Sequence, residues 1–251
     1  DKLDYIESLG TTCIYLSPVF EAYSSHKYDT GDFMKLDAMF GDEEIFSELC
    51  KQAGERGIRV ILDGVFNHTG DDSRYFNAYG TYPGSSAFTA LSRYHTWFEF
   101  FEGKDYRSWW GIHTLPTVRK NSVGYKEMLF GEDGVIRKWL RLGASGWRLD
   151  VVDELPDDFV EELVAAAKAE KPDAVVLGEV WEDAVLKESY GNAFVPYLTN
   201  NYEEVHVIDF RYFGQSLKSY MQDNDIDEVL FINNVMSANA AVQLDRIREI
   251  Y

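Results

Sequence analysis

Short apolar runs recur along the chain and alternate with amphipathic stretches. The runs that we expect to form strands cover residues 12–20, 59–66, 146–152, 174–180, 205–210 and 229–235. Several runs, such as Arg59-Val-Ile-Leu, are apolar at successive positions, which is typical of strands covered on both faces. Strands that alternate with helices predict an α/β fold with a parallel sheet.

Three amphipathic stretches have helix start or stop signals. The first contains Leu3, Ile6 and Leu9 and stops at Gly10. The second follows Asp42, a capping residue, and we expect it to bury Ile45, Phe46, Leu49 and Ala53 and to close at Gly54 and Gly57. The third starts at Pro156 with an acidic, solvated first face and buries Val160, Leu163, Val164 and Ala167.

Residues 68–118 show no sustained period and are rich in glycine, serine and aromatic residues. Long segments of this kind within a domain are usually functional or disordered, and the tryptophans of this one favour order. We therefore divide the chain into a first part of the main fold (1–67), an irregular insertion (68–118) and a second part of the main fold (119–251).

Composition narrows the classes of function. The net charge of −19 argues against nucleic acids and anionic membranes as partners, and it suits a neutral ligand. Cys13 and Cys50 are expected to be buried free thiols. The sequence contains no membrane-spanning run and no signal peptide, which favours a cytoplasmic location. The chain opens on a helical pattern without an initiator Met, so we expect the natural N-terminus to be missing.

Polar side chains gather where the apolar runs stop. Asp63, Arg148, Asp150 and Glu179 lie at the ends of three expected strands, and Tyr28 with Asp29 follows the first run. In a parallel barrel these ends form the active face. Arg148 and Asp150 are two residues apart, so the guanidinium can keep the carboxylate ionised as a nucleophile. The apolar setting of Glu179 suits a general acid.

Three segments in this order resemble the signature regions of the α-amylase family. They are Asp63-Gly-Val-Phe-Asn-His, Gly146-Trp-Arg-Leu-Asp-Val-Val-Asp-Glu and Gly178-Glu-Val-Trp. Two further stretches, His26-Lys-Tyr-Asp-Thr-Gly-Asp-Phe with Phe40-Gly-Asp, and Trp109-Trp-Gly with Leu115-Pro, are similar to the neopullulanase, cyclomaltodextrinase and maltogenic amylase branch. The resemblance covers the chain almost without a break to about residue 200.

The resemblance implies a (β/α)8 TIM barrel with a small insertion after its third strand, and α-1,4-glucan or cyclodextrin substrates. It implies Asp150 as nucleophile, Glu179 as acid/base and Arg148 as the partner of Asp150. The implied substrate contacts are Tyr28, Asp63, His68, Glu154, Trp181 and Asn239. Retention of configuration would require the two catalytic carboxyl groups to lie roughly 5 Å apart. Asn67 occupies a position that binds calcium in some relatives, although this branch often lacks the ion, and no other cofactor is implied.

The pattern departs from the family after residue 200. Relatives have Ser-His-Asp at the end of the seventh strand, and the best alignment places Ser237-Ala238-Asn239 there. In another alignment register, Asp209, Asp225 or Asp227 would be the candidate for the aspartate of that run. Loss of that carboxylate would weaken transition-state contacts, so a catalytically silent α-glucan-binding barrel is the alternative function.

Counting the strand–helix repeats along the chain predicts strands two to seven of the barrel, which would leave the outer edges of the first and last of these strands unpaired. We therefore expect either a homo-oligomer or a complementing segment to cover them, and the chain to be an excerpt or an engineered product. Two other enzyme classes are disfavoured: the sequence has no glycine-rich phosphate loop after a late strand, and His26, His68, His95 and His113 lack the spacing of metal ligands.

Overall fold

The computed structural model describes residues 2–103, 105–180, 188–189, 192–193 and 205–209. Its main sheet contains five parallel strands in the order β1-β4-β5-β6-β9, which is also their order in the chain. The strands are β1 (Cys13–Leu16), β4 (Arg59–Gly64), β5 (Gly146–Leu149), β6 (Val175–Val180) and β9 (Val205–Asp209). Each successive strand is thus added at the same edge of the sheet. This is the order in a (β/α) barrel, whereas a doubly wound sheet adds strands at both edges.

Five of the six predicted strands are confirmed, and the sixth, residues 229–235, lies outside the described residues. Two of the expected strands end earlier than predicted, because 59–66 ends at Gly64 and 146–152 ends at Leu149, before the left-handed Val151. The expected strand 12–20 is two strands, because β1 ends at Leu16 and β2 (Phe20–Ala22) pairs in antiparallel fashion with β3 (Thr30–Leu36). Pro18 lies between the two and has no N–H for a sheet ladder. A further two-stranded sheet joins β7 (Glu188–Ser189) and β8 (Asn192–Ala193).

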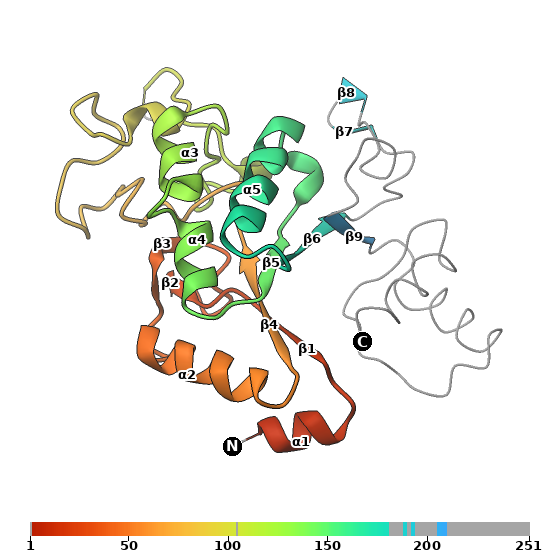
Figure 1. The fold of residues 1–251 in the computed structure, drawn as a ribbon. Coiled ribbons are helices and arrows are strands. Elements are labelled where there is room, and N and C mark those ends of the chain that lie inside the picture. Colours follow the sequence, from red (N-terminus) through yellow and green to blue (C-terminus); the bar gives the residue numbers. More distant parts are fainter. Residues whose placement is uncertain (1, 104, 181–187, 190–191, 194–204, 210–251) are drawn as a thin grey trace, which may run out of the picture.

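The helices begin and end near the predicted signals. They are α1 (Leu3–Ser8), α2 (Glu43–Gly54), α3 (Val123–Phe130), α4 (Val135–Arg141) and α5 (Asp157–Glu170), and only α3 and α4 were not predicted. Asp42 Oδ1 accepts a hydrogen bond from Ile45 N at 2.9 Å, which confirms the cap of α2. The helices α2 to α5 gather on one side of the main sheet (Figure 1).

The buried face of α2 differs from the prediction. Phe46, Cys50 and Ala53 are buried, whereas Ile45 is 56% exposed. The side chain of Ile45 instead packs over Gly41, where an added Cβ would lie 2.6 Å from Ile45 Cδ1. The predicted stripe of α5 is confirmed at Val160, Leu163 and Ala167, with Val164 partly buried against the core. Cys13 is half-buried rather than buried, and both cysteines are free.

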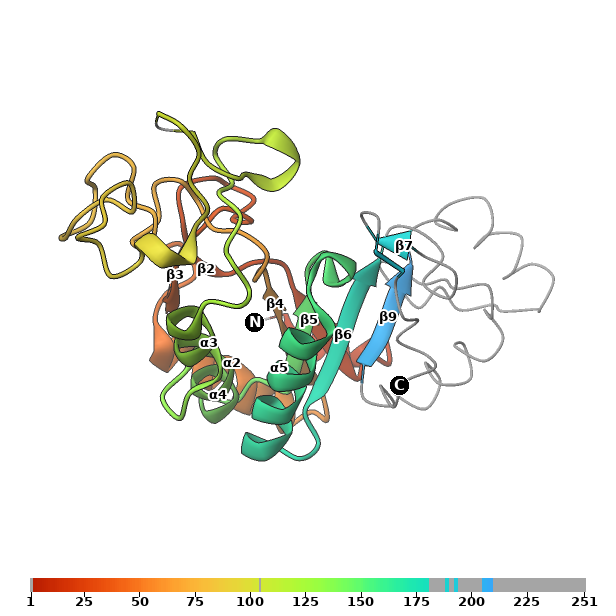
Figure 2. The same cartoon turned by 90° about the horizontal axis from the view of Figure 1, so that it is seen from above.

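Between residues 68 and 118 the structure describes only two 3-10 turns, His95–Trp97 and Trp109–Gly111, and isolated bridges. The two ends of the segment lie side by side, because His68 pairs with Thr117. Buried aromatic residues give it a core, with the Phe76 ring 4.8 Å from that of Phe98 and 4.6 Å from that of Tyr106. The segment lies at one end of the sheet (Figure 2), where the ring of Trp97 lies 5.2 Å from that of Tyr125 in α3. Among the described residues, no helix is long and apolar enough to cross a bilayer.

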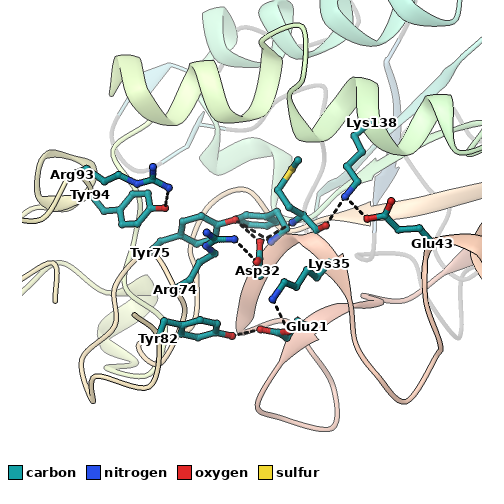
Figure 3. A network of polar contacts seen from close by, with 12 residues as sticks. Glu21, Asp32, Lys35, Glu43, Arg74, Tyr75, Tyr82, Arg93, Tyr94 and Lys138 are labelled. Carbon is teal, nitrogen blue, oxygen red and sulfur yellow. Dashed lines mark hydrogen bonds and ion pairs between the residues drawn. The ribbon is translucent and has the colours of Figure 1, made fainter. Parts of the chain in front are cut away.

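A polar network fastens this segment to the β2–β3 hairpin (Figure 3). We call it the fastening network, and its members are Glu21, Asp32, Arg74, Tyr75 and Tyr82. The side chain of Asp32 is 0% exposed and lies 2.6 Å from Arg74 Nη1. Tyr75 donates a hydrogen bond to Asp32 at 3.2 Å, and Tyr82 donates one to Glu21. The hairpin, which the sequence analysis did not predict, therefore provides the base of the irregular segment.

Candidate active site

Four buried charged residues meet at the carboxyl ends of three neighbouring strands. Asp63 in β4 is in register with Arg148 in β5, Asp150 follows β5, and Glu179 lies in β6. Their exposed fractions are 1%, 3%, 6% and 5% in that order. The carboxyl ends of parallel strands form one edge, so the predicted gathering of these residues is observed.

Arg148 is the centre of this group, which we call the strand-end cluster. Its Nη1 lies 2.8 Å from Asp63 Oδ1 and 2.9 Å from Asp150 Oδ1. Its Nη2 lies 2.6 Å from Glu179 Oε1. One guanidinium therefore serves three carboxylates, whereas the sequence analysis paired it with Asp150 alone.

The charges of the strand-end cluster do not balance. If all three carboxylates were ionised, the buried group would hold two uncompensated negative charges. Burial raises the pKa of Asp63 and that of Asp150, and their mutual repulsion raises the latter further, against the opposing effect of Arg148. A hydrogen bond between the carboxyl groups of Asp150 and Glu179 acts in the same direction on the pKa of Asp150. Burial and the crowding of carboxylates around one cation therefore favour protonation within the cluster.

The structure adds two partners to the expected pair. Arg148 was expected to keep Asp150 ionised, and it contacts Asp150 while also contacting Asp63 and Glu179. The same carboxylates raise the pKa of Arg148 above its ordinary value, although burial by itself would lower it. The guanidinium thus stays charged and holds the acids in place.

The chain makes a strained turn directly after Asp150. Val151 has φ 42° and ψ 51°, a left-handed conformation that is rare for a β-branched residue. Its N–H donates to Glu179 Oε2 at 3.0 Å, while Asp150 N donates to Gly64 O at 3.2 Å. Both oxygens of Glu179 are thereby engaged, one by Arg148 and one by this turn. Such strain persists only where surrounding contacts enforce it, and it is common at functional sites.

Two tyrosines flank the cluster. Tyr15 in β1 donates a hydrogen bond to Asp63 Oδ2, and Tyr28 makes a side-chain hydrogen bond with Tyr15. Burial, followed by the charge of Asp63, raises the pKa of Tyr28 to about 12. Tyr28 was predicted, but Tyr15 was missed. The available signal was its hydroxyl within an otherwise apolar run, one residue before the strand ends.

A second polar group lies beside the first, on the irregular segment and the turn after β5. His68 is 1% exposed, and its ring stacks on that of Trp109 at 5.1 Å. Burial, followed by Lys120, lowers the pKa of His68 to about 3, so the imidazole is neutral at physiological pH. Its Nε2 is buried without a hydrogen-bond partner among the described residues. Glu154 accepts hydrogen bonds from Trp109 Nε1 at 3.0 Å and from Asn67 Nδ2 at 3.4 Å.

Asn67 does not fit a calcium site in this arrangement. Lys120 Nζ donates to Asn67 O at 2.9 Å and also to Asn67 Oδ1. The ammonium group therefore takes the two oxygens that a calcium ion would use. Burial lowers the pKa of Lys120 to about 7. Across the described residues, no group of three or more His, Cys, Asp and Glu side chains could hold a metal ion.

Some predicted residues are not placed. Trp181, Ser237, Ala238 and Asn239, together with Asp225 and Asp227, lie outside the described residues. Asp209 ends β9, where its Cα is in register with Val180. Lys120 was not predicted, and neither was a contact role for Trp109 and Trp110, although the two tryptophans formed part of the resemblance. Their link to Glu154 spans more than forty residues of sequence and leaves no local signal.

Comparisons with known proteins show what the chain is similar to. Residues 1–125 match the family model of the alpha amylase catalytic domain. The chain is 38% identical to an amylopullulanase of Thermoanaerobacterium thermosulfurigenes, over 94% of this chain and 14% of that protein. It is 38% identical to neopullulanase 2 of Thermoactinomyces vulgaris, over 73% of this chain and 31% of that protein.

The fold is also similar to that of a solved structure, the type III pullulan hydrolase from Thermococcus kodakarensis. The TM-score is 0.64 with 36% identity, over 72% of this chain and 32% of that one. The chain thus spans less than a third of the length of each of these three relatives.

Proposed function

Because this chain belongs to the α-amylase family of glycoside hydrolases, we propose that it supplies the catalytic centre of a retaining glycosidase. Its substrates would be the α-1,4-glucosidic bonds of maltodextrins, starch or cyclodextrins. The observation that supports this best is the strand-end cluster, in which three buried carboxylates share Arg148. Five parallel strands in chain order suit part of a (β/α)8 barrel, whose active face lies at these strand ends.

The reaction would proceed in two displacements. Asp150 attacks the anomeric carbon and forms a glycosyl ester, while Glu179 gives its proton to the departing glycosidic oxygen. Glu179 then takes a proton from water, which attacks the same carbon and releases Asp150. The mechanism requires one proton on the pair before cleavage. The crowding of three carboxylates around Arg148 favours such a proton. With the proton on Glu179, Asp150 is ionised beside Arg148 Nη1, and transfer of the proton to the departing oxygen leaves Glu179 ionised while Asp150 is held as the ester.

The surrounding residues would hold the sugar. The neutral, unpartnered Nε2 of His68 suits a hydrogen bond to a sugar hydroxyl, and Tyr28 offers a ring face beside the acids. Asp63 would have a different role. Its carboxylate is held by Arg148 and Tyr15, which favours a positioning role through Arg148 over the direct sugar contact that the resemblance implies.

The test compares two substrates and two variants. Wild-type protein should release reducing sugar from maltotriose and β-cyclodextrin with retained anomeric configuration, measured by proton NMR. Asp150→Asn should abolish turnover of every substrate. Glu179→Gln should abolish turnover of maltotriose but still release the chromophore of a maltoside with a good leaving group in a first burst, because that departure needs little protonation.

The outcomes separate the two candidate functions. Hydrolysis that persists in Asp150→Asn would refute the assigned nucleophile. Binding of maltodextrin without hydrolysis by the wild type would support the alternative, a silent α-glucan-binding barrel, which Ala238 and Asn239 favour at the sequence level. A protein that neither binds nor cleaves α-glucans would contradict both.

A further inference from the structure

Three aromatic rings form a ladder that leads away from the strand-end cluster. The ring of His68 lies 5.1 Å from that of Trp109 at an interplanar angle of 25°. The ring of Trp109 lies 5.4 Å from that of Trp110 at 30°. Exposure rises along the ladder, because His68 is 1% exposed, Trp109 is half-buried and Trp110 is 60% exposed. The ring of Trp110 therefore presents a large apolar surface to water. It is linked through Trp109 to His68, a residue of the candidate active site.

The outer ring is fixed in place although it is exposed. Trp110 Nε1 donates to Glu154 Oε1 at 3.1 Å, on the same carboxylate that accepts from Trp109 Nε1. The backbone of Trp110 is left-handed, with φ 52°, and Gly111 follows with φ 78°. Ile112 N closes this turn on Trp109 O at 2.9 Å. A left-handed backbone is strained for a residue other than glycine, so the surrounding contacts must enforce it.

We propose that Trp110 is a platform on which a glucosyl unit of the α-glucan chain stacks, beyond the unit that reacts at Asp150 and Glu179. This inference rests on the proposed function and adds to it a residue that determines preference for chain length.

The chemistry of the ladder fits a neutral sugar. Glu154 takes the indole N–H of Trp110, so the ring offers chiefly its flat face. The face of an aromatic ring is electron-rich, and the C–H groups on one side of a glucose ring are its natural partner. A ring that is already fixed loses little conformational freedom on binding, which favours affinity. Exposed aromatic rings also occur at protein interfaces, and that alternative is an outcome of the test below.

The first test measures kcat and KM on maltotriose and on maltoheptaose. We expect Trp110→Ala to lower kcat/KM for maltoheptaose about tenfold through KM, which corresponds to about 1.4 kcal/mol, and to leave maltotriose nearly unchanged. Trp110→Phe should restore most of the loss because it keeps a ring face. The control is Phe101→Ala, which removes a ring that is 47% exposed on the same segment but outside the ladder; it should match the wild type on both substrates.

Two results would overturn the proposal. If Trp110→Ala reduces kcat equally on both substrates, the residue has a structural role only. If it leaves both substrates unchanged, the platform does not exist, and self-association or protein binding lost in the same variant would mark an interface.

A binding experiment separates this inference from the proposed function. Maltoheptaose is titrated calorimetrically into Asp150→Asn and into the double variant Asp150→Asn, Trp110→Ala. An approximately tenfold weaker Kd in the double variant would support the platform even if the wild type hydrolyses nothing. Equal Kd values would refute the platform while leaving hydrolysis by the wild type as independent support for the proposed function.

Discussion

Two clusters in this molecule bring an arginine to a buried carboxylate, and they differ in charge balance. In the fastening network Arg74 faces one fully buried carboxylate, Asp32, which also accepts hydrogen bonds from Met34 N and Tyr75 (Figure 3). In the strand-end cluster Arg148 faces three. The balanced pair of Arg74 and Asp32 joins the irregular segment to the hairpin. In the unbalanced group burial and repulsion between the carboxylates favour retention of a proton, and a retained proton can be donated to a substrate.

The largest effect should follow loss of the central cation. Arg148→Met leaves three buried carboxylates without a counter-charge, so we expect the free energy of unfolding to fall by about 3–5 kcal/mol and turnover to vanish. The loss should be smaller at pH 5 than at pH 8, because protonation removes the uncompensated charges. Chemical denaturation at both pH values measures it. The control Arg141→Met removes an exposed cation that pairs with Glu132 and Glu170, and it should cost far less stability than Arg148→Met because solvent screens these pairs. Equal losses in the two variants would contradict the comparison.

The balanced cluster should respond in stability and not in chemistry. Asp32→Asn keeps an acceptor for Met34 N but leaves Arg74 unpaired, so we expect a loss of about 2–3 kcal/mol in the free energy of unfolding. Well below the unfolding transition, kcat should stay close to the wild-type value. The matched control is Glu43→Gln, which breaks the exposed pair with Lys138 and should cost less than about 1 kcal/mol. A large fall in kcat with unchanged stability would place Asp32 in the chemistry.

His68 should make the candidate site sensitive to acid. The unfolded chain takes up a proton at this residue as the pH falls below 6.5, whereas the folded protein does so only near 3. The stability present at pH 7 is therefore lost progressively as the pH falls between these values, by about 2 kcal/mol at pH 5. His68→Phe keeps the stacking on Trp109 but does not titrate. The difference in unfolding free energy between wild type and variant should shift by that amount between pH 7 and pH 5, and a constant difference would show that His68 is protonated in the folded state.

The smallest expected effect has the opposite sign. Asp150→Asn removes one of three crowded negative charges, so the variant should be inactive and yet more stable by about 1 kcal/mol at pH 7. The raised pKa of Asp150 gives the direction of the pH dependence: the wild type loses stability as the pH rises from the unfolded pKa through the folded one, and the gain in the variant should disappear in acid. Thermal unfolding at pH 7 and pH 4 measures it. A variant less stable than the wild type at pH 7 would mean that the cluster is balanced after all.

The sequence was informative wherever a signal is local. Asp42 three residues before Ile45, the stripe of α5 and the apolar run of β4 all act within a few residues, and each produced an element where it was expected. The hairpin of β2 and β3 was not predicted, because its turn depends on the buried pair of Lys27 and Asp37, which lie 2.6 Å apart but ten residues apart in the sequence. The exposure of Ile45 was missed although its contact is local, because the helical period does not show that the side chain packs on Gly41, which lies before the start of α2.

The sequence by itself determined the parallel α/β rhythm, the placing of acids at strand ends and the family. Only the tertiary structure decided that one guanidinium serves Asp63, Asp150 and Glu179, and that one carboxylate, Glu154, fixes two indoles. The physical reason is the separation along the sequence over which each interaction acts. Helix caps and apolar periods depend on neighbours along the chain, whereas Arg148 meets Asp63 across 85 residues, at a distance set by strand register and side-chain orientation.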